Sequence, residues 1–257
     1  MSYKFEMPKD NSDKVVYELE SNAVIIVGAN GSGKSRMGIK IEKDDPLNVH
    51  RIVAQKSLVF ERYIPQKSYE HATNLILFGN QNKRNNNDER YPFDGEKRNY
   101  VSYAVNDFNN VLAALFALHN KEQGAFIKEC KELEKNGENH NNVPEMSIDK
   151  LIKIWNYIFP HRDIYFEDGR VICLYKKDDI TRDYEGREMS DGERAALYLI
   201  SQAICVPGDK KVIIIDEPEL HLHHSIMNKI LAAIEHERKD ILFIYITHDL
   251  HYVTLIF

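Results

Sequence analysis

A glycine-rich segment that follows four apolar residues constrains this chain more than any other feature. Residues 24–35 read VIIVGANGSGKS, which places Gly28 and Gly33 at the ends of a Gly-x4-Gly pattern and Lys34 and Ser35 directly after it. A buried strand that runs into such a turn and then into a helix is the context in which this pattern forms a phosphate-binding loop. A glycine turn without a ligand is the less favoured interpretation.

Each residue type in this loop has a chemical reason. Glycines let successive backbone N–H groups approach a triphosphate closely, and the helix that follows adds its positive end. We expect Lys34 to contact the β- and γ-phosphates and Ser35 to bind Mg²⁺ between them. The predicted nucleotide-binding residues are the loop and the first helical residues: Gly28, Ala29, Asn30, Gly31, Ser32, Gly33, Lys34, Ser35 and Arg36.

Composition permits one large α/β domain. With 257 residues and 43% hydrophobic content, the chain can bury a substantial core. The net charge of -6 argues against a surface devoted to nucleic acid or anionic membranes, although a local basic patch stays open. Scattered Cys130, Cys173 and Cys205 predict free thiols, and no apolar run approaches the roughly 18 residues of a membrane span. We therefore expect a cytoplasmic protein.

Periodicity divides the rest of the chain into elements. Residues 3–20 predict one or two strands, and residues 50–58 predict another strand. The Asn-rich residues 79–99 favour a solvated surface loop, with contact to a partner or nucleic acid as the alternative. Helical spacing predicts an inserted lobe at about 105–160, with an αα-hairpin broken near Gly124.

Further signals surround this lobe. A helix is expected around residues 148–157, and Asp168-Gly169 is expected to form the turn of a hairpin.

Two further apolar runs end in polar side chains. Val212 to Ile215 precede Asp216 and Glu217, and the run ILFIYI precedes Thr247 and His248. Ligands bind at the carboxyl ends of parallel strands. We expect Asp216 to hold Mg²⁺, Glu217 to act as general base for the attacking water, and His248 to bond the γ-phosphate.

The segment SDGERAALYLI supplies the element that decides between kinds of nucleotide-binding protein. Ser190 fits an N-cap with Glu193 as its capping-box partner, so in isolation the segment indicates a well-capped helix. Its position between the loop and Asp216 favours a second role. Together with Gly192, Ser190 offers a helix N-terminus that, on sequence, has no anion of its own.

The order of these motifs resembles that of ABC-type ATPase heads, in particular the SMC, RecF and OLD-like branch. The motifs are the loop, Gln55 after a strand, SDGER, VIIIDEP and ITHD, and they span nearly the whole chain. The resemblance implies a P-loop NTPase of ABC-ATPase type: an α/β fold with a mostly parallel core sheet, an N-terminal β-subdomain and the inserted helical lobe. ATP and Mg²⁺ are the implied cofactors.

The same resemblance assigns further residues. Gln55 becomes the lid glutamine near Mg²⁺, Ser190 and Gly192 the signature residues, and His248 the switch histidine. Asp191 and Glu193 depart from the commoner Leu-Ser-Gly-Gly-Gln signature. In such heads the signature helix of one subunit completes the phosphate site of another, which implies a homodimer or higher oligomer with composite ATP sites.

The segment DEPELHLHH is closer to OLD-like and RecF-like ATPases than to transporters. Zinc binding by His221, His223 and His224 is the less favoured interpretation, because the resemblance places a dimer-contacting loop there. Only nine residues follow His248, so we expect the ATPase domain of residues 1–257 to be incomplete at its C-terminus.

Two functions remain open on sequence. The favoured one is an ATP-hydrolysing switch that dimerises around ATP and controls an effector, such as a Toprim-like nuclease in a fused domain or a separate protein. By resemblance it would act in anti-phage defence, as in PARIS-type or retron-associated systems. The alternative is a DNA-repair or chromosome-maintenance head that binds DNA directly; the absence of a long heptad run counts against its SMC form.

Overall fold

The computed structural model describes most of the chain. The described residues are 3–8, 14–19, 21–53, 58–82, 85, 87–91, 93–94, 97–98, 107–138, 142–177 and 180–249. Their elements, in chain order, are β1 (Tyr3–Pro8), β2 (Lys14–Leu19), β3 (Ala23–Val27), α1 (Lys34–Asp44), β4 (Val49–Val53), α2 (Tyr69–Phe78), η2 (Asp88–Arg90), β5 (Phe93–Asp94), β6 (Lys97–Arg98), α3 (Phe108–Lys135), α4 (Ser147–Ile158), β7 (Arg162–Glu167), β8 (Arg170–Lys177), β9 (Ile180–Glu185), η3 (Gly186–Glu188), α5 (Asp191–Cys205), β10 (Val212–Asp216), α6 (His224–Glu237) and β11 (Leu242–Thr247).

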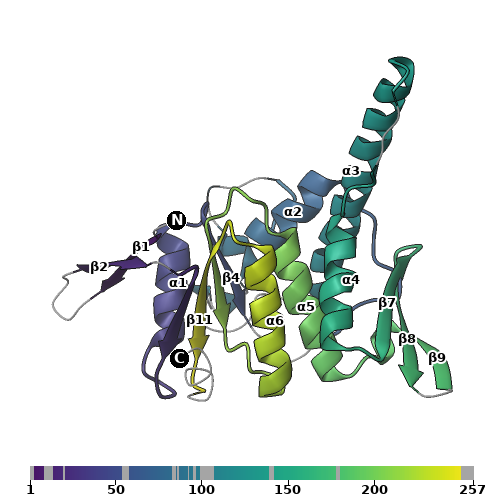
Figure 1. Ribbon diagram of the computed structural model, residues 1–257. Helices are drawn as coiled ribbons and strands as arrows, with labels where there is room; N and C mark the ends of the chain where they lie inside the picture. Colours follow the sequence, from purple (N-terminus) through teal and green to yellow (C-terminus); the bar gives the residue numbers. More distant parts are fainter. Residues whose placement is uncertain are drawn as a thin grey trace.

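A parallel sheet with the order β3-β11-β10-β4 forms the centre of the fold (Figure 1). Its β10 and β11 are almost wholly buried, as expected for strands covered by helices on both faces. One strand, β11, separates the strand that enters the glycine loop from the strand that ends at Asp216. The predicted parallel α/β core is confirmed.

Helices cover the two faces of this sheet differently. Helix α1 packs on one face, where Met37 and Ile41 join a small apolar cluster with residues of β10 and β11. Gly38 permits this close approach, because a Cβ there would lie 2.6 Å from Ile246 Cδ1. The larger core lies on the other face, where α5 and α6 pack with α3 and α4.

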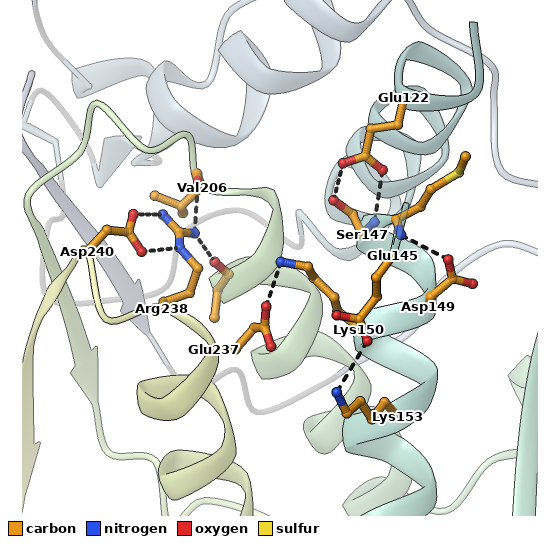
Figure 2. Close-up of polar contacts among 12 residues, drawn as sticks. Glu122, Glu145, Ser147, Asp149, Lys150, Lys153, Val206, Glu237, Arg238 and Asp240 are labelled. Atoms are coloured by element: carbon orange, nitrogen blue, oxygen red, sulfur yellow. Dashed lines mark hydrogen bonds and ion pairs between the residues drawn. The ribbon is translucent and has the colours of Figure 1, made fainter. Parts of the chain in front are cut away.

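The helical layer is joined by polar contacts at its ends (Figure 2). Glu122 of α3 accepts hydrogen bonds from the backbone N and the hydroxyl of Ser147, at distances of 2.8 and 2.6 Å, where α4 begins. Lys150 of α4 pairs with Glu237 of α6 at 2.6 Å. Arg238 donates to the carbonyls of Ala203 and Val206, at 2.6 and 2.8 Å, and so satisfies the C-terminal end of α5.

The predicted break near Gly124 is wrong. Helix α3 runs without interruption from Phe108 to Lys135 and projects from the body of the molecule (Figure 1). A single exposed glycine costs a helix only about 1 kcal/mol relative to alanine. Buried residues in the first three turns of α3, among them Leu112 and Leu115, anchor the helix and outweigh that cost.

Two antiparallel elements flank the core, at opposite sides of the view in Figure 1. β1 and β2, where one or two strands were expected, pair antiparallel, and β7, β8 and β9 form a three-stranded sheet. The turn at Asp168 and Gly169 is confirmed, and both residues have positive φ, 50° and 71°. That pair of angles is the signature of the mirror-image turn that suits twisted hairpins. The third strand, β9, was not foreseen.

The prediction of a solvated loop at residues 79–99 is wrong for part of its length. Arg90 and Tyr91 are buried, at 4% and 2% exposed. Arg90 Nη2 donates to the backbone oxygen of Arg51 at 2.9 Å, on a strand that has a single neighbour in the described sheet. Several other residues of this segment lie outside the described residues. No helix among the described residues is long and apolar enough to cross a membrane.

Candidate nucleotide-binding site

The glycine loop connects β3 to α1 through residues 28–33. Gly31 and Gly33 have φ of 81° and 94°, in the left-handed region that L side chains rarely adopt. At Gly28 the space is limited, since a Cβ there would lie 2.8 Å from Ser32 Oγ, and that hydroxyl would have to move. The loop therefore needs glycine at Gly31 and Gly33, and Ser35 lies within the first turn of the helix it leads into.

A cavity of about 280 Å³ opens at this loop. Its lining residues are Asn30, Gly31, Gly33, Lys34, Ser35, Arg36 and Glu217. Six of these come from the predicted loop and helix start, and Glu217 comes from the turn after β10. Of the other predicted loop residues, Gly28, Ala29 and Ser32 shape the loop without lining the cavity.

Lys34 lies against the loop that precedes it. Its Nζ donates to the carbonyl oxygens of Gly28 and Ala29, at 2.6 and 3.0 Å. These neutral acceptors hold the ammonium beside the cavity. A phosphate oxygen is a stronger acceptor for the same cation, since charge-assisted hydrogen bonds are about twice as strong as neutral ones.

Asp216 ends β10, and its two carboxylate oxygens have different partners. Oδ1 accepts from the Ser35 hydroxyl at 3.2 Å, and Oδ2 pairs with Arg51 Nη2 at 2.6 Å. The Asp216 and Arg51 side chains are only 3% and 1% exposed. Burial opposes the charge of Arg51, but the interactions with Asp216, Tyr91 and Glu42 together outweigh it, so that the pKa of Arg51 is raised.

Ser35 and Asp216 together suit a magnesium ion. A hydroxyl and a carboxylate supply the hard oxygen ligands that Mg²⁺ prefers, and the ion usually keeps several waters beside them. Because Arg51 occupies Oδ2, the carboxylate presents Oδ1 on the Ser35 side. Sequence reasoning missed Arg51, although a charged side chain within an apolar strand was the available signal.

Glu217 has an unusual backbone. Its φ is 55°, which for a non-glycine residue is held only by its surroundings. Its N–H donates to the carbonyl of Ile246 at 2.8 Å, which ties the turn after β10 to β11. The exposed side chain lines the cavity, where a carboxylate can accept a proton from water.

His248 lies at the end of the strand between β3 and β10. The register pairs Thr247 with Val27 and Ile246 with Asp216, so that His248 comes at the level of Gly28. Its Nδ1 lies 3.0 Å from Glu219 Oε1. Glu219 was not singled out on sequence, and its position three residues after Asp216 was the only signal.

The predicted lid residue, Gln55, lies outside the described residues. The structure describes β4 only to Val53, which pairs with Asp216. The strand that Gln55 follows is thus the neighbour of the strand that carries Asp216.

Ser190 and Gly192 occupy the N-terminus of α5. They are not among the residues that line the cavity of their own chain. Ser190 is the N-cap, and Glu193 completes the predicted capping box: its Oε2 accepts from the Ser190 N and Oγ at 2.9 and 2.7 Å. A Cβ at Gly192 would lie 3.4 Å from the carbonyl oxygen of His221.

The expectation that this helix end has no anion of its own is wrong. Glu193 is 6% exposed, and its other oxygen pairs with Arg162 Nε at 2.9 Å and accepts from Tyr184 OH at 2.5 Å. Arg162 and Tyr184 belong to β7 and β9, which sequence reasoning did not connect with this helix. A carboxylate near a helix N-terminus stabilises it by the same electrostatics that would attract a phosphate.

The histidines after β10 are spread over separate roles. His223 Nδ1 accepts from the Ser225 N at the start of α6, and His224 Nδ1 lies 2.6 Å from Asp249 Oδ2. His221 has φ of 67° in the turn that precedes them. Within the described ranges, no three His, Cys, Asp or Glu side chains gather as a metal site.

A buried polar network lies beneath Asp216. Glu42 of α1 accepts from the Arg51 backbone N at 3.3 Å and from Arg90 Nη1 at 2.9 Å, and it also accepts from Tyr91 OH. Arg90 Nη1 lies 3.4 Å from His50 Nδ1. The network thus passes from Asp216 to the edge of the sheet.

The same network continues to α5. His50 Nε2 lies 3.0 Å from Gln202 Oε1, and Gln202 Nε2 donates to Asp107 and to Tyr198 OH. An amide oxygen only accepts, so His50 Nε2 carries the proton and Nδ1 accepts from Arg90. Burial, and then the charge of Arg90, lower the pKa of His50 well below 6.5, which agrees with this neutral ring.

A second cavity, of about 260 Å³, lies among the ends of α4, α5 and α6. Its charged side chains pair with one another: Lys150 with Glu237, and Arg238 with Asp240 (Figure 2). The residues predicted to bind nucleotide do not line it.

Part of the chain is similar to a known protein family. Residues 176–253 match the family model described as AAA domain, putative AbiEii toxin, Type IV TA system. No curated protein matches the chain. Among solved structures, a crystal structure described as the SmcHead bound to the C-winged helix domain of ScpA is 18% identical and has a TM-score of 0.45. The match covers 97% of this chain and 90% of that chain.

The matched residues 176–253 include Ser190 at the start of α5, Asp216 at the end of β10 and His248 directly after β11. The glycine loop lies outside that range and is identified by its own geometry, with glycines of positive φ leading into α1. The parallel sheet, its loop and the buried aspartate beside Ser35 make the fold that of an α/β P-loop NTPase.

Proposed function

We propose that this chain binds ATP with Mg²⁺ at the glycine loop and hydrolyses it. One observation carries the proposal: the cavity at the loop brings Lys34, Ser35 and Glu217 together, and Asp216 lies in hydrogen-bond contact with Ser35. Lys34 supplies the cation for the β- and γ-phosphates, and Ser35 and Asp216 the oxygen ligands for Mg²⁺. When bound, Mg²⁺ would neutralise phosphate charge.

In the proposed hydrolysis Glu217 is the general base. A carboxylate that lines the cavity can orient a water and accept its proton as the water attacks the γ-phosphate. His248 is the proposed hydrogen-bond partner of the γ-phosphate, and Gln55 the lid residue near the metal. Ser190 and Gly192 are proposed to act in a second copy of the chain, because they do not line the cavity of their own chain.

The direct test measures ATP affinity and steady-state ATP turnover of the purified chain with Mg²⁺. We expect saturable binding, turnover that requires a divalent cation, and a dimer that forms with ATP when hydrolysis is blocked. Absence of ATP binding would contradict the proposal as a whole. Binding without turnover would reduce the chain to a nucleotide-dependent scaffold.

We also propose that ATP-driven dimerisation controls an effector in anti-phage defence, a Toprim-like nuclease being the favoured effector. The matched family is described as a putative toxin of a type IV toxin–antitoxin system, which supports a role in governing a harmful activity. Protection of cells that carry the gene with its neighbouring reading frames tests this. Plaque numbers should fall with the natural gene and recover with Lys34→Ala.

A further inference from the structure

The carboxylate of Glu219 connects the turn after β10 to the end of β11. Its Oε1 accepts from the Thr247 hydroxyl at 2.6 Å and from the His248 backbone N at 3.2 Å, and it lies 3.0 Å from His248 Nδ1. The Glu219 side chain is 10% exposed, whereas that of His248 is 46% exposed. A largely buried acceptor thus holds the inner side of a ring that faces solvent.

The backbone places Glu219 firmly for this contact. The Glu217 N–H bonds to β11 at Ile246, and the Leu220 and Leu222 N–H groups close turns onto the carbonyls of Glu217 and Glu219, at 3.1 and 3.3 Å. At the other end, Thr247 is fully buried. The turn that carries Glu219 and the Thr247 residue that it contacts are therefore both held in place by contacts that do not involve the histidine ring.

Contacts of Glu219 that served only to hold β10 and β11 together would be redundant. β10 already pairs with β11 in parallel register over the whole length of β10, from Val212 with Leu242 to Asp216 with Ile246. The contacts of Glu219 lie beyond that ladder, at the level of the glycine loop. What they add is the orientation of His248.

We propose that Glu219 is a positioning residue for ATP hydrolysis, which holds His248 through Nδ1 and leaves Nε2 as the ring nitrogen that contacts the γ-phosphate. This inference rests on the proposed ATPase function. One turn then serves the reaction in two ways: Glu217 faces the cavity, and Glu219 orients the histidine of the neighbouring strand. Fixing an exposed ring in advance lowers the entropy lost when it binds, and small misplacements of such groups reduce rates strongly.

The test compares steady-state turnover and ATP affinity of the wild-type chain with those of Glu219→Ala, Glu219→Gln and Glu219→Asp. We expect Glu219→Ala to lower kcat about tenfold and to change the Kd for ATP less than about twofold. Glu219→Gln should keep at least about a third of kcat, since its amide oxygen still accepts hydrogen bonds at the same reach. Glu219→Asp keeps the charge, but its side chain is one methylene shorter. Its kcat should therefore be lower than that of Glu219→Gln.

Glu235→Ala is the matched control, because Glu235 also accepts from β11, through Tyr245 OH at 2.6 Å, but away from the end of the strand. Its kcat should equal that of the wild type. The double variant Glu219→Ala with His248→Ala should be no slower than His248→Ala alone, since Glu219 acts through the histidine. Unfolding midpoints and ATP binding identify any variant that fails to fold; the Gln and Asp variants then decide the question.

Several outcomes would overturn the inference while leaving the proposed function intact. The first is an unchanged kcat in Glu219→Ala. The second is a double variant in which the losses in kcat of the two single variants multiply. The third is an active Glu219→Asp with an inactive Glu219→Gln, which would mean that the negative charge is what the reaction requires. A wild-type chain that hydrolyses no ATP would instead contradict the proposed function itself.

Discussion

The N-termini of α1 and α5 are the two helix ends that the proposed function assigns to phosphate, and they are built in opposite ways. Helix α1 begins after Gly33, with no side-chain cap and no acidic residue in its first turn. Helix α5 begins after Ser190, with a complete capping box and with Asp191 and Glu193 in its first turn. Orphan N–H groups and a positive helix end attract an anion only where no carboxylate already satisfies them.

This difference indicates what each helix end contributes. In the proposed function, the α1 end forms an anion site within one chain, with Lys34 as its cation. The α5 end is stable by itself, because Glu193 bonds Ser190 and joins α5 to Arg162 of β7. A role for Ser190 in a partner's site therefore has to add to, or replace, contacts that the chain already makes. Four predictions test this contrast.

The largest effect is expected at the α1 end. Lys34→Ala removes the cation whose Nζ lies beside Gly28 and Ala29, and we expect ATP affinity to fall by about two to three orders of magnitude. Isothermal titration measures this. Lys40→Ala, on the exposed side of the same helix, is the matched control and should bind ATP normally. Equal affinity in Lys34→Ala would contradict the phosphate-binding loop.

The second effect separates binding from chemistry in the same cavity. Glu217→Gln keeps the size of the side chain but removes the base, so kcat should fall about a hundredfold while ATP still binds. The variant should therefore accumulate as an ATP-bound dimer, which light scattering detects. Turnover at the wild-type rate would show that another residue is the base.

The third prediction concerns the α5 end. Ser190→Arg should lower turnover at least about tenfold without weakening ATP binding to the chain's own loop, because the bulky side chain blocks only a partner's γ-phosphate. Mixing this variant with Lys34→Ala should restore part of the activity, since one composite site then has both Lys34 and Ser190 intact. Normal hydrolysis by Ser190→Arg would leave α5 as a capped helix only.

A mixture that stays inactive is informative when heterodimers are demonstrated. Either both composite sites must act together, or Ser190 has no role in the partner's site. If Ser190→Arg binds ATP but no longer dimerises, the first explanation is favoured, in which both sites must act together. If it dimerises like the wild type, the second is favoured, in which Ser190 has no role in the partner's site.

The smallest effect concerns the buried network between the two regions. His50 is neutral in the fold, with its pKa lowered well below 6.5 by burial and by Arg90. Below about pH 6.5 the unfolded chain takes up a proton that the folded chain refuses, so stability falls as the pH falls. From about pH 7.5 to about pH 6 this group should cost about 0.8 kcal/mol.

Urea unfolding at the two pH values measures that loss. His50→Gln should be less stable than the wild type at the higher pH, yet should lose less stability on acidification, because it removes the titrating ring. His236→Gln, at an exposed position of α6, is the control. Its loss of stability between the two pH values should equal that of the wild type. An equal loss in His50→Gln would mean that the ring is not held neutral.

Much of the fold was predictable because its signals are local. The turn at Asp168 and Gly169 and the capping box of Ser190 and Glu193 each involve residues within a few positions of one another. Apolar runs before Asp216 and His248 predicted buried parallel strands in the same way. The local signal at Gly124 misled, because the packing of α3 outweighs one unfavourable residue.

What the sequence by itself determined is a glycine loop for phosphate, two buried strands that end in acidic and imidazole side chains, and a capped helix between them. Only the tertiary structure decided which polar groups meet: Arg51 with Asp216, 165 residues apart, and Glu219 with Thr247, 28 residues apart. The physical reason is that such pairs depend on the strand order β3-β11-β10-β4, which is set by the packing of the whole core. Burying a charge without a partner is costly, and the packing of the fold determines which side chain lies close enough to pair with it.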